Sequence, residues 1–154
     1  MAHYTTTART SLDPEQAFAF MADLRNLATW DPGVSRVERL TEHRDLGARY
    51  EVSLRSALVR TLRYEVVAFE PPRSLRVVAR TAWLESVDVM SVERTEQGTF
   101  VTYDATLTLR GSLRVLDHVL QRAFDRIGDQ AAAGLRRALG EGGLAQPRSE
   151  RRGL

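Results

Sequence analysis

The stretch from residue 49 to residue 109 constrains the fold most, because apolar and polar residues alternate along it with a period of two. This period is typical of strands that bury one face and leave the other in water. A Pro-Pro pair at 71–72 forces one turn, and a Gln-Gly pair at 97–98 indicates a hairpin. A Thr-rich segment at 3–11 and an irregular segment at 34–40 add further strands. The sequence therefore predicts one strand followed, after an interruption, by six more.

The interruption between the first and second strands carries helix signals. Asp13 suits an N-cap, Pro14 suits the first helical turn, and Gln16 can close a capping box with Asp13. A second short helical turn is expected over 24–28, and the Pro-Gly pair at 32–33 then ends the helical region. Two short helices are therefore predicted here.

A long helix is predicted after the last strand. Ser112 is expected to cap its start, and Gly140 to end it after about Leu139. Its predicted apolar stripe consists of Leu113, Leu116, Leu120, Phe124, Ile127, Ala131, Leu135 and Leu139. Only this helix is long enough to cover the apolar face of the sheet. A twisted sheet that grips one helix leaves a space that is either filled by side chains or holds a ligand.

Length and composition fit one globular domain of 154 residues. The chain has no Cys, and all of its basic side chains are Arg, which excludes disulfides, thiolate chemistry and a Schiff-base lysine. No signal peptide and no apolar run of about 20 residues is visible, so we expect a cytoplasmic protein without a transmembrane segment. The segment 141–154 is rich in Gly, Pro and Arg and is expected to be a flexible tail.

Charge is unevenly distributed along the predicted strands. Residues 44–80 hold eight Arg against four acidic residues, whereas residues 81–109 hold one Arg against five. Either opposite charges pair across neighbouring strands or the Arg form a basic patch for an anionic partner. We favour pairing, because acidic residues interleave with the Arg. No basic stripe with interleaved aromatic residues exists, so no nucleic-acid partner is expected.

Several segments together resemble a known family. They are "LDPEQAFAFMADLRNLATWDPGVSRVERL", "VVAFEPPRSLRVV", "EQGTFVTYDATLTLRG" and the long terminal helix. Over about residues 4–140 their order resembles the START-like (SRPBCC) superfamily, and within it the polyketide cyclase/dehydrase and lipid-transport group. The resemblance implies an α+β helix-grip fold, in which a seven-stranded antiparallel sheet curves around the C-terminal helix with an apolar cavity between them. It implies a START-like domain over 1–140, and members that are ligand binders, lipid carriers or cyclases.

Motifs for metals and nucleotides are absent from the sequence. The three histidines, His3, His43 and His118, are far apart in the chain and form no HxxxH or HExxH spacing. The sequence contains no GxGxxG motif, no P-loop and no G-x-S-x-G elbow. We therefore expect no metal site and no cofactor, and a surface position for His118.

Three tyrosines on the strands are candidate catalytic residues. Tyr50, Tyr64 and Tyr103 share the apolar faces of their strands, and a buried phenol normally needs a hydrogen-bond partner. They are either core residues satisfied by backbone or water, or hydroxyls that orient a ligand carbonyl or phenol at the cavity.

Asp88 is the fourth catalytic candidate, and its direction depends on strand register. In one register it faces inward with Ser86 and Met90, and in the other Val87 and Val89 face inward and Asp88 lies in water. The pattern favours the second register. If Asp88 lies inside, burial would raise its pKa and make it a candidate general base.

Apolar residues on the inward faces are the candidate ligand contacts. Trp30, beside the Pro-Gly turn, and Trp83, at the start of a strand, are expected at the cavity opening, where each would alternatively only pack a turn. Asp31 is expected to cap that turn. The full predicted set is Phe18, Trp30, Val52, Leu54, Val66, Val77, Trp83, Met90, Val101, Leu116, Leu120 and Phe124.

Three functions follow from these observations, in order of preference. The first is binding of a small hydrophobic molecule, such as a lipid, an isoprenoid or an aromatic polyketide. The second is a cofactor-independent cyclase or dehydratase that uses the Tyr and Asp groups to polarise a carbonyl and transfer a proton. The third is a protein-interaction module that uses the Arg-rich outer face of the sheet. The sequence leaves open whether the protein is a monomer or a dimer.

Overall fold

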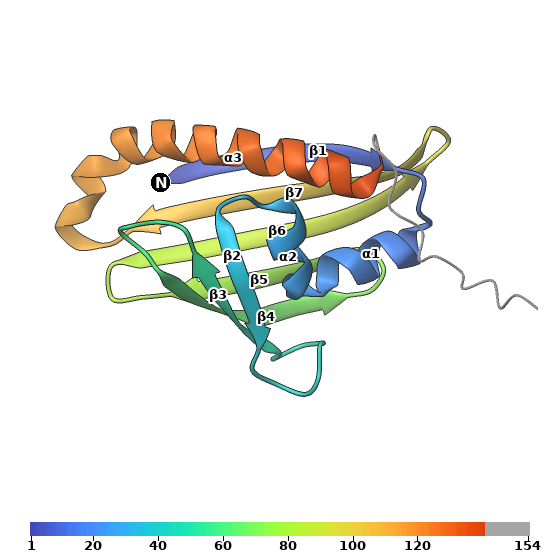
Figure 1. The fold of residues 1–154 in the computed structure, drawn as a ribbon, viewed down its shortest axis with the longest axis horizontal. Helices are drawn as coiled ribbons and strands as arrows, with labels where there is room; N and C mark the ends of the chain where they lie inside the picture. Colours follow the sequence, from blue (N-terminus) through green and yellow to red (C-terminus); the bar gives the residue numbers. More distant parts are fainter. Residues whose placement is uncertain (141–154) are drawn as a thin grey trace, which may run out of the picture.

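The computed structural model describes residues 1–140, and the predicted tail at 141–154 lies outside the described residues. Seven strands, three α-helices and two 3₁₀ helices make up the described chain, which confirms the predicted α+β helix-grip architecture (Figure 1). In chain order they are β1 (Ala2–Thr10), α1 (Pro14–Ala22), η1 (Leu24–Asn26), α2 (Leu27–Trp30), β2 (Val34–Arg39), β3 (Arg49–Leu54), β4 (Thr61–Glu70), β5 (Ser74–Arg80), β6 (Leu84–Thr95), β7 (Gly98–Leu109), η2 (Gly111–Leu116) and α3 (Asp117–Leu139).

All seven strands form one antiparallel sheet in the order β1-β7-β6-β5-β4-β3-β2. Because every pairing is antiparallel, the connections fall alternately at two opposite ends of the sheet. One end, called the η2 end below, gathers the segments 31–33, 55–60, 81–83 and 110–116. The other, called the hairpin end, gathers the segments 11–13, 40–48, 71–73 and 96–97.

The predicted start of α1 is confirmed. The backbone N–H of Gln16 donates to Asp13 Oδ1 at 2.8 Å, and the side chain of Gln16 accepts from the backbone N–H of Asp13 at 3.3 Å. This reciprocal capping box, with Pro14 in the first turn, satisfies donors that a helix start otherwise leaves without partners.

The predicted cap of the long helix is wrong. Ser112 lies exposed in η2 and makes no capping hydrogen bond, and α3 begins only at Asp117. The carboxylate of Asp117 lies in the first turn, where its negative charge interacts favourably with the positive end of the helix dipole. It also pairs with the N-terminal ammonium. The predicted end is confirmed, since Gly140 adopts a φ of 136° and its N–H donates to the carbonyl of Arg136.

Only the second half of the predicted stripe on α3 is buried. Ala131, Leu135 and Leu139 are buried, whereas Leu116 and Ile127 are 47% and 50% exposed. Figure 1 shows α3 lying along β1 while η2 overhangs the sheet at the opposite end of the helix from its buried half. The helix pattern is therefore continuous in sequence, but the partner surface covers only part of it.

Pairing of charges on the outer face of the sheet is confirmed for several Arg. Arg63 Nε lies 3.0 Å from Glu51 Oε2, and these two residues are register partners on β4 and β3. Glu85 accepts from both Arg80 at 2.7 Å and Arg110 at 3.1 Å. These pairs are exposed, so each contributes on the order of 1 kcal/mol or less.

Two glycines let α3 approach its neighbours closely. A Cβ at Gly128 would overlap the ring of Tyr4 on β1, and a Cβ at Gly134 would overlap the backbone carbonyl of Trp30 on α2. At Gly134 the overlapping atom belongs to the backbone, so the carbonyl of Trp30 cannot move without shifting α2. Gly134 is therefore required for the contact between α2 and α3.

We expect Gly134→Ala to lower the free energy of unfolding by about 2–4 kcal/mol, because the added methyl group forces α2 and α3 apart. Chemical denaturation followed by circular dichroism measures the change. Ala133→Ser, on the exposed side of the same turn, is the control and should change the free energy by about 0.5 kcal/mol or less. An unchanged stability for Gly134→Ala would contradict the requirement for glycine.

Candidate functional site

The inward face of the sheet is mostly apolar, apart from buried threonines on β1 and β7 and one cluster of polar side chains that includes a carboxylate. Ser86 and Asp88, on β6, are 5% exposed, and the phenols of Tyr64 and Tyr103 come from β4 and β7. Around them lie buried apolar residues from every neighbouring strand. A buried polar cluster in such surroundings needs internal hydrogen bonds.

The register favoured from the sequence is wrong for β6. Asp88 pairs with Val77 on β5 and Ala105 on β7, and all three side chains are buried on the inward face. Val87 and Val89 lie on the outer face, where they are half-buried. Because β6 carries apolar residues on both faces, its own pattern does not fix its direction, and the neighbouring strands decide it.

Hydrogen bonds join the cluster into a chain. The hydroxyl of Tyr103 donates to Asp88 Oδ2 at 3.0 Å, and Ser86 Oγ donates to Asp88 Oδ1 at 3.3 Å. The hydroxyl of Tyr64 in turn donates to Ser86 Oγ at 2.9 Å. Both oxygens of Asp88 therefore accept a hydrogen bond. Loss or gain of a proton at Asp88 changes the strength of every hydrogen bond in this series.

Burial controls the protonation of the cluster. It raises the pKa of Asp88 from 3.8 to about 7, although the hydrogen bonds from Tyr103 and Ser86 oppose this by favouring the carboxylate. Burial and then the nearby charge of Asp88 raise the pKa values of Tyr64 and Tyr103 well above their ordinary value of 10.0. The phenols thus remain donors, and Asp88 can exchange a proton near neutral pH.

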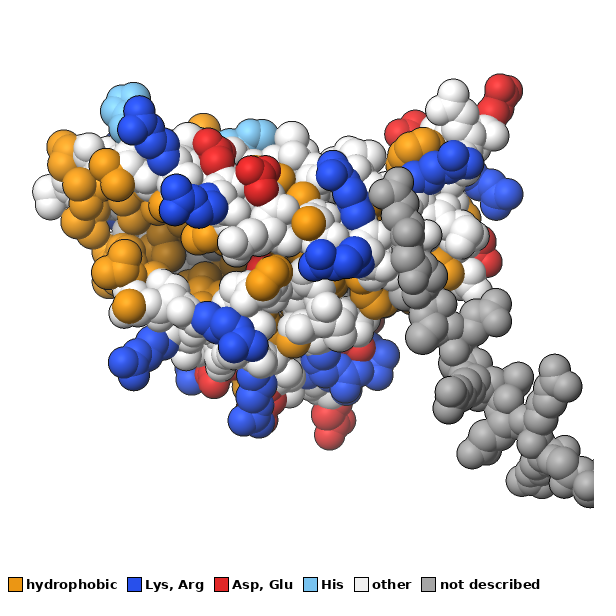
Figure 2. Space-filling model, turned by 45° about the horizontal axis from the view of Figure 1, so that its top comes forward, with side chains coloured by type: hydrophobic (Ala, Val, Ile, Leu, Met, Phe, Trp, Pro, Cys, Tyr) orange, Lys and Arg blue, Asp and Glu red, His pale blue; other side chains and the backbone are white. Residues whose placement is uncertain are grey.

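The cluster lies inward from the η2 end of the sheet. Along β6, Ser86 and Asp88 follow the first strand residue, Leu84, at steps of two, which places them roughly 7 and 14 Å from the strand end. Half-buried apolar side chains lie nearer that end; they are Leu54, Trp83, Leu107, Leu113, Leu120 and Phe124. Figure 2 shows hydrophobic side chains gathered at this end around a hollow.

A family model for "Polyketide cyclase / dehydrase and lipid transport" matches residues 1–140. The chain belongs to this family. Comparison with curated proteins finds no significant sequence match.

Solved structures share the fold of this family member. A START superfamily protein from Mycobacterium smegmatis superposes with a TM-score of 0.72 at 10% identity, over 90% of this chain and 97% of that one. The di-domain ARO/CYC protein BexL of the BE-7585A biosynthetic pathway gives 0.65 at 19% identity, over 92% of this chain and 50% of that one. A protein from Deinococcus radiodurans gives 0.58 at 20% identity, over 90% and 93%. At these identities the likeness establishes the fold alone.

Three of the four predicted catalytic residues come together, and Tyr50 does not join them. Tyr50 is wholly buried beside Tyr64, but its hydroxyl has no hydrogen-bond partner among residues 1–140. Burial raises its pKa, and the charges that act on it are those of Asp23, Arg39 and other residues away from the cluster. Ser86 was not predicted as a site residue, although its spacing of two from Asp88 places both on one face.

The predicted ligand contacts separate into a buried group and an outer group. Leu54, Trp83, Leu120 and Phe124 are half-buried near the η2 end, and Leu116 is the most exposed. The others are 5% exposed or less; they are Phe18, Trp30, Val52, Val66, Val77, Met90 and Val101. Contact of either group with a ligand stays a prediction.

Trp30 packs onto the polar cluster. Its ring meets that of Tyr103 edge to face, with centroids 5.3 Å apart. The following residue, Asp31, accepts from the backbone N–H of Gly33 at 2.8 Å, so the predicted cap of the Pro-Gly turn is confirmed. Burial raises the pKa of Asp31, and its charge contributes to the raised pKa of Asp88.

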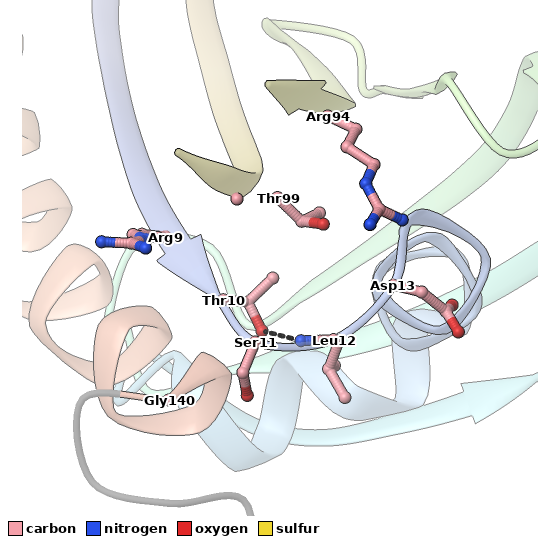
Figure 3. Close-up of a pocket in the computed structure, with 9 residues that line it drawn as sticks. Arg9, Thr10, Ser11, Leu12, Asp13, Arg94, Thr99 and Gly140 are labelled. Carbon is pink, nitrogen blue, oxygen red and sulfur yellow. Dashed lines mark hydrogen bonds between the residues drawn. The ribbon is translucent and has the colours of Figure 1, made fainter. Parts of the chain in front are cut away.

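Two open pockets of about 460 Å³ each lie away from this cluster. The one in Figure 3 is at the hairpin end, where Arg94, Thr99 and Thr10 surround it beside Gly140. The other lies along β2 and includes Arg25 and Arg39. Their linings are largely charged or hydroxylic, so neither suits an apolar ligand.

No metal-binding group and no membrane span is found in the described part of the chain. Within residues 1–140 no three His, Asp or Glu side chains lie close enough together to hold a metal ion. His3, His43 and His118 are all exposed, as predicted for His118. None of the helices within 1–140 is both long and apolar enough to cross a membrane.

The raised pKa of Asp88 predicts a pH dependence of stability. Between about pH 4 and pH 7 the folded state keeps a proton on Asp88 that the unfolded state has released, so stability falls as the pH rises through this window. Compared with Asp88→Asn, the free energy of unfolding of the wild type should fall by up to about 4 kcal/mol between pH 4 and pH 7. Above pH 7 the difference between the two proteins should not change further. Denaturant titrations at a series of pH values measure the difference.

The control for this experiment is Asp45→Asn, which removes an exposed carboxylate in the β2–β3 connection. The difference between the wild type and this variant should stay constant over the same window. If the difference in free energy of unfolding between the wild type and Asp88→Asn also stayed constant, the pKa of Asp88 would not be raised.

Proposed function

We propose that this chain binds a small apolar molecule, such as a lipid, an isoprenoid or an aromatic polyketide, between the sheet and the first half of α3. The observation that carries the proposal is the hollow at the η2 end (Figure 2). Half-buried apolar residues lie at this end, and the buried polar cluster of Asp88, Tyr103 and Tyr64 lies farther inside. An apolar body would fill the hollow, and a hydroxyl or carbonyl at its inner end would meet Tyr64 or Asp88. Few polar groups in an apolar pocket are typical of sites for small organic ligands.

Family membership supports the same proposal. The family is described by polyketide cyclisation or dehydration and by lipid transport, and both kinds of substrate are largely apolar. Contact between an apolar side chain and such a ligand contributes binding free energy in proportion to the apolar area that is removed from water.

Leu120→Gln should weaken binding of an apolar fluorophore about tenfold, because it places an amide where the ligand would bury an apolar surface. Val119→Gln is the matched control, because Val119 is the adjacent residue but is 69% exposed on another side of α3. Fluorescence titration measures both affinities, and native mass spectrometry of freshly purified protein identifies any ligand that copurifies. A wild type that binds no fluorophore, or equal affinities in the two variants, would contradict the proposal.

A second candidate function is catalysis of a cyclisation or dehydration. The observation that favours it is the pairing of Asp88, with a pKa of about 7, and Tyr103, which stays protonated. Asp88 would remove a proton next to a carbonyl, and a phenol would donate to the oxygen that gains charge. BexL, an ARO/CYC protein of a biosynthetic pathway, supports the compatibility of this fold with such a role.

Under this second function, Asp88→Asn should lower the turnover of an aromatic polyketide precursor at least about a hundredfold while fluorophore affinity stays within about threefold. The rate of the wild type should rise with pH through about 7, as the carboxylate forms. Turnover that is equal in wild type and variant would exclude Asp88 as the base. Binding without turnover in the wild type would leave binding as the function.

A further inference from the structure

The η2 end carries a concentration of exposed apolar side chains. Val115 and Leu116 in η2 are 82% and 47% exposed, and Val119 in the first turn of α3 is 69% exposed. Ile127, midway along α3, is 50% exposed. Across the sheet end, Leu58 in the β3–β4 connection is 86% exposed. These five residues are called the apolar rim below. Other exposed large apolar residues, such as Leu46 and Val67, are scattered over other parts of the surface.

Helix geometry explains why the rim on α3 is uncovered. At 3.6 residues per turn, Leu116 and Ile127 lie on nearly the same side of the helix as Gly134, about five and two turns before it. At Gly134 this side packs against Trp30 of α2. Nearer the η2 end this side is covered only in part, so the side that makes the closest contact in the second half is about half exposed in the first half.

The rim is flanked by positive charge. Arg55 and Arg60 bracket Leu58, and Arg114 and Arg122 flank the rim residues of η2 and α3. All four side chains are exposed, and none forms an ion pair within residues 1–140. Among the acidic residues nearby, Asp117 pairs with the N-terminal ammonium and Asp125 accepts from Gln121. The surface is therefore apolar at its centre and cationic at its edge.

We propose that the η2 end docks on an anionic lipid membrane. The apolar rim would enter the boundary between headgroups and acyl chains, and the four Arg would meet anionic headgroups. The inference rests on the proposed function, because hydrophobic side chains gather around the hollow at this same end of the molecule (Figure 2). Docking there would let an apolar ligand pass between membrane and protein without crossing water.

Charge argues for a membrane over a second copy of this chain. In a two-fold dimer the same patch faces itself, so the Arg at its edge would face Arg of the other copy with few carboxylates between them. An anionic bilayer supplies opposite charge and an apolar layer over the same area.

Vesicle flotation tests the proposal. Vesicles of phosphatidylcholine with phosphatidylglycerol are compared with vesicles of phosphatidylcholine alone, at low and high salt. The wild type should float with the anionic vesicles and at least about tenfold less with the neutral ones, and salt should weaken the binding. Val119→Glu and Leu58→Glu should each weaken it about tenfold or more, because each places a carboxylate in the boundary region.

Matched variants separate the surface from general effects of charge. Leu46→Glu adds the same charge to an exposed leucine, 62% exposed, at the hairpin end and should float as the wild type does. Arg55→Gln with Arg60→Gln should weaken flotation by about 10- to 30-fold. Arg49→Gln with Arg76→Gln, on the strands, removes equal charge and should have little effect. Thermal unfolding checks that every variant is folded.

Three results would overturn the proposal: no flotation of the wild type, equal flotation with neutral vesicles, or flotation of Val119→Glu equal to that of the wild type. Sedimentation that shows a dimer broken by Val119→Glu would also overturn it, by assigning the rim to a second copy. Fluorophore binding without vesicles, measured on the same samples, keeps the two proposals apart. Fluorophore binding without flotation ends the docking proposal alone, and loss of both ends the proposed function as well.

Discussion

The contact between Gly134 of α3 and the backbone of Trp30 holds the C-terminal helix against the short helices that follow β1. It fixes α2 against the C-terminal helix, and α2 in turn places the ring of Trp30 on Tyr103. Tyr103 is one of the two donors to Asp88, so the geometry of the polar cluster depends in part on a helix contact that uses no polar side chain. A shift of one element in a close-packed interior displaces the side chains that contact it, because there is no empty space to absorb the shift.

The two halves of α3 differ in how closely they pack against the rest of the protein. The second half packs closely against β1 and α2, whereas the first half lies along β1 but carries half-buried and exposed apolar residues. A helix that packed along its whole length would leave no apolar surface beside the hollow. The unequal packing thus accounts both for the apolar surface of the proposed ligand site and for the exposed apolar residues at the same end of the molecule.

Much of the fold was predictable, because its signals are local. The capping box of Asp13 and Gln16, the end of α3 at Gly140 and the alternation along the strands each depend on residues a few positions apart. The start of α3 was not predictable in this way. Ser112 has the chemistry of a cap, but the chain first makes η2, and the sequence contains no separate signal for that turn.

The sequence by itself determined the order of the strands and of the main helices, the start of α1, the end of α3 and the apolar faces of most strands, since these follow from backbone geometry and side-chain spacing. It also supplied the polar residues from which a site could be made. Only the tertiary structure decided that Asp88 faces inward and that the hydroxyl of Tyr50 lies apart from the cluster. It alone also decided that half of the helix stripe stays uncovered. These outcomes depend on strand register and on which distant element packs against each face, and neither is encoded in the neighbouring residues.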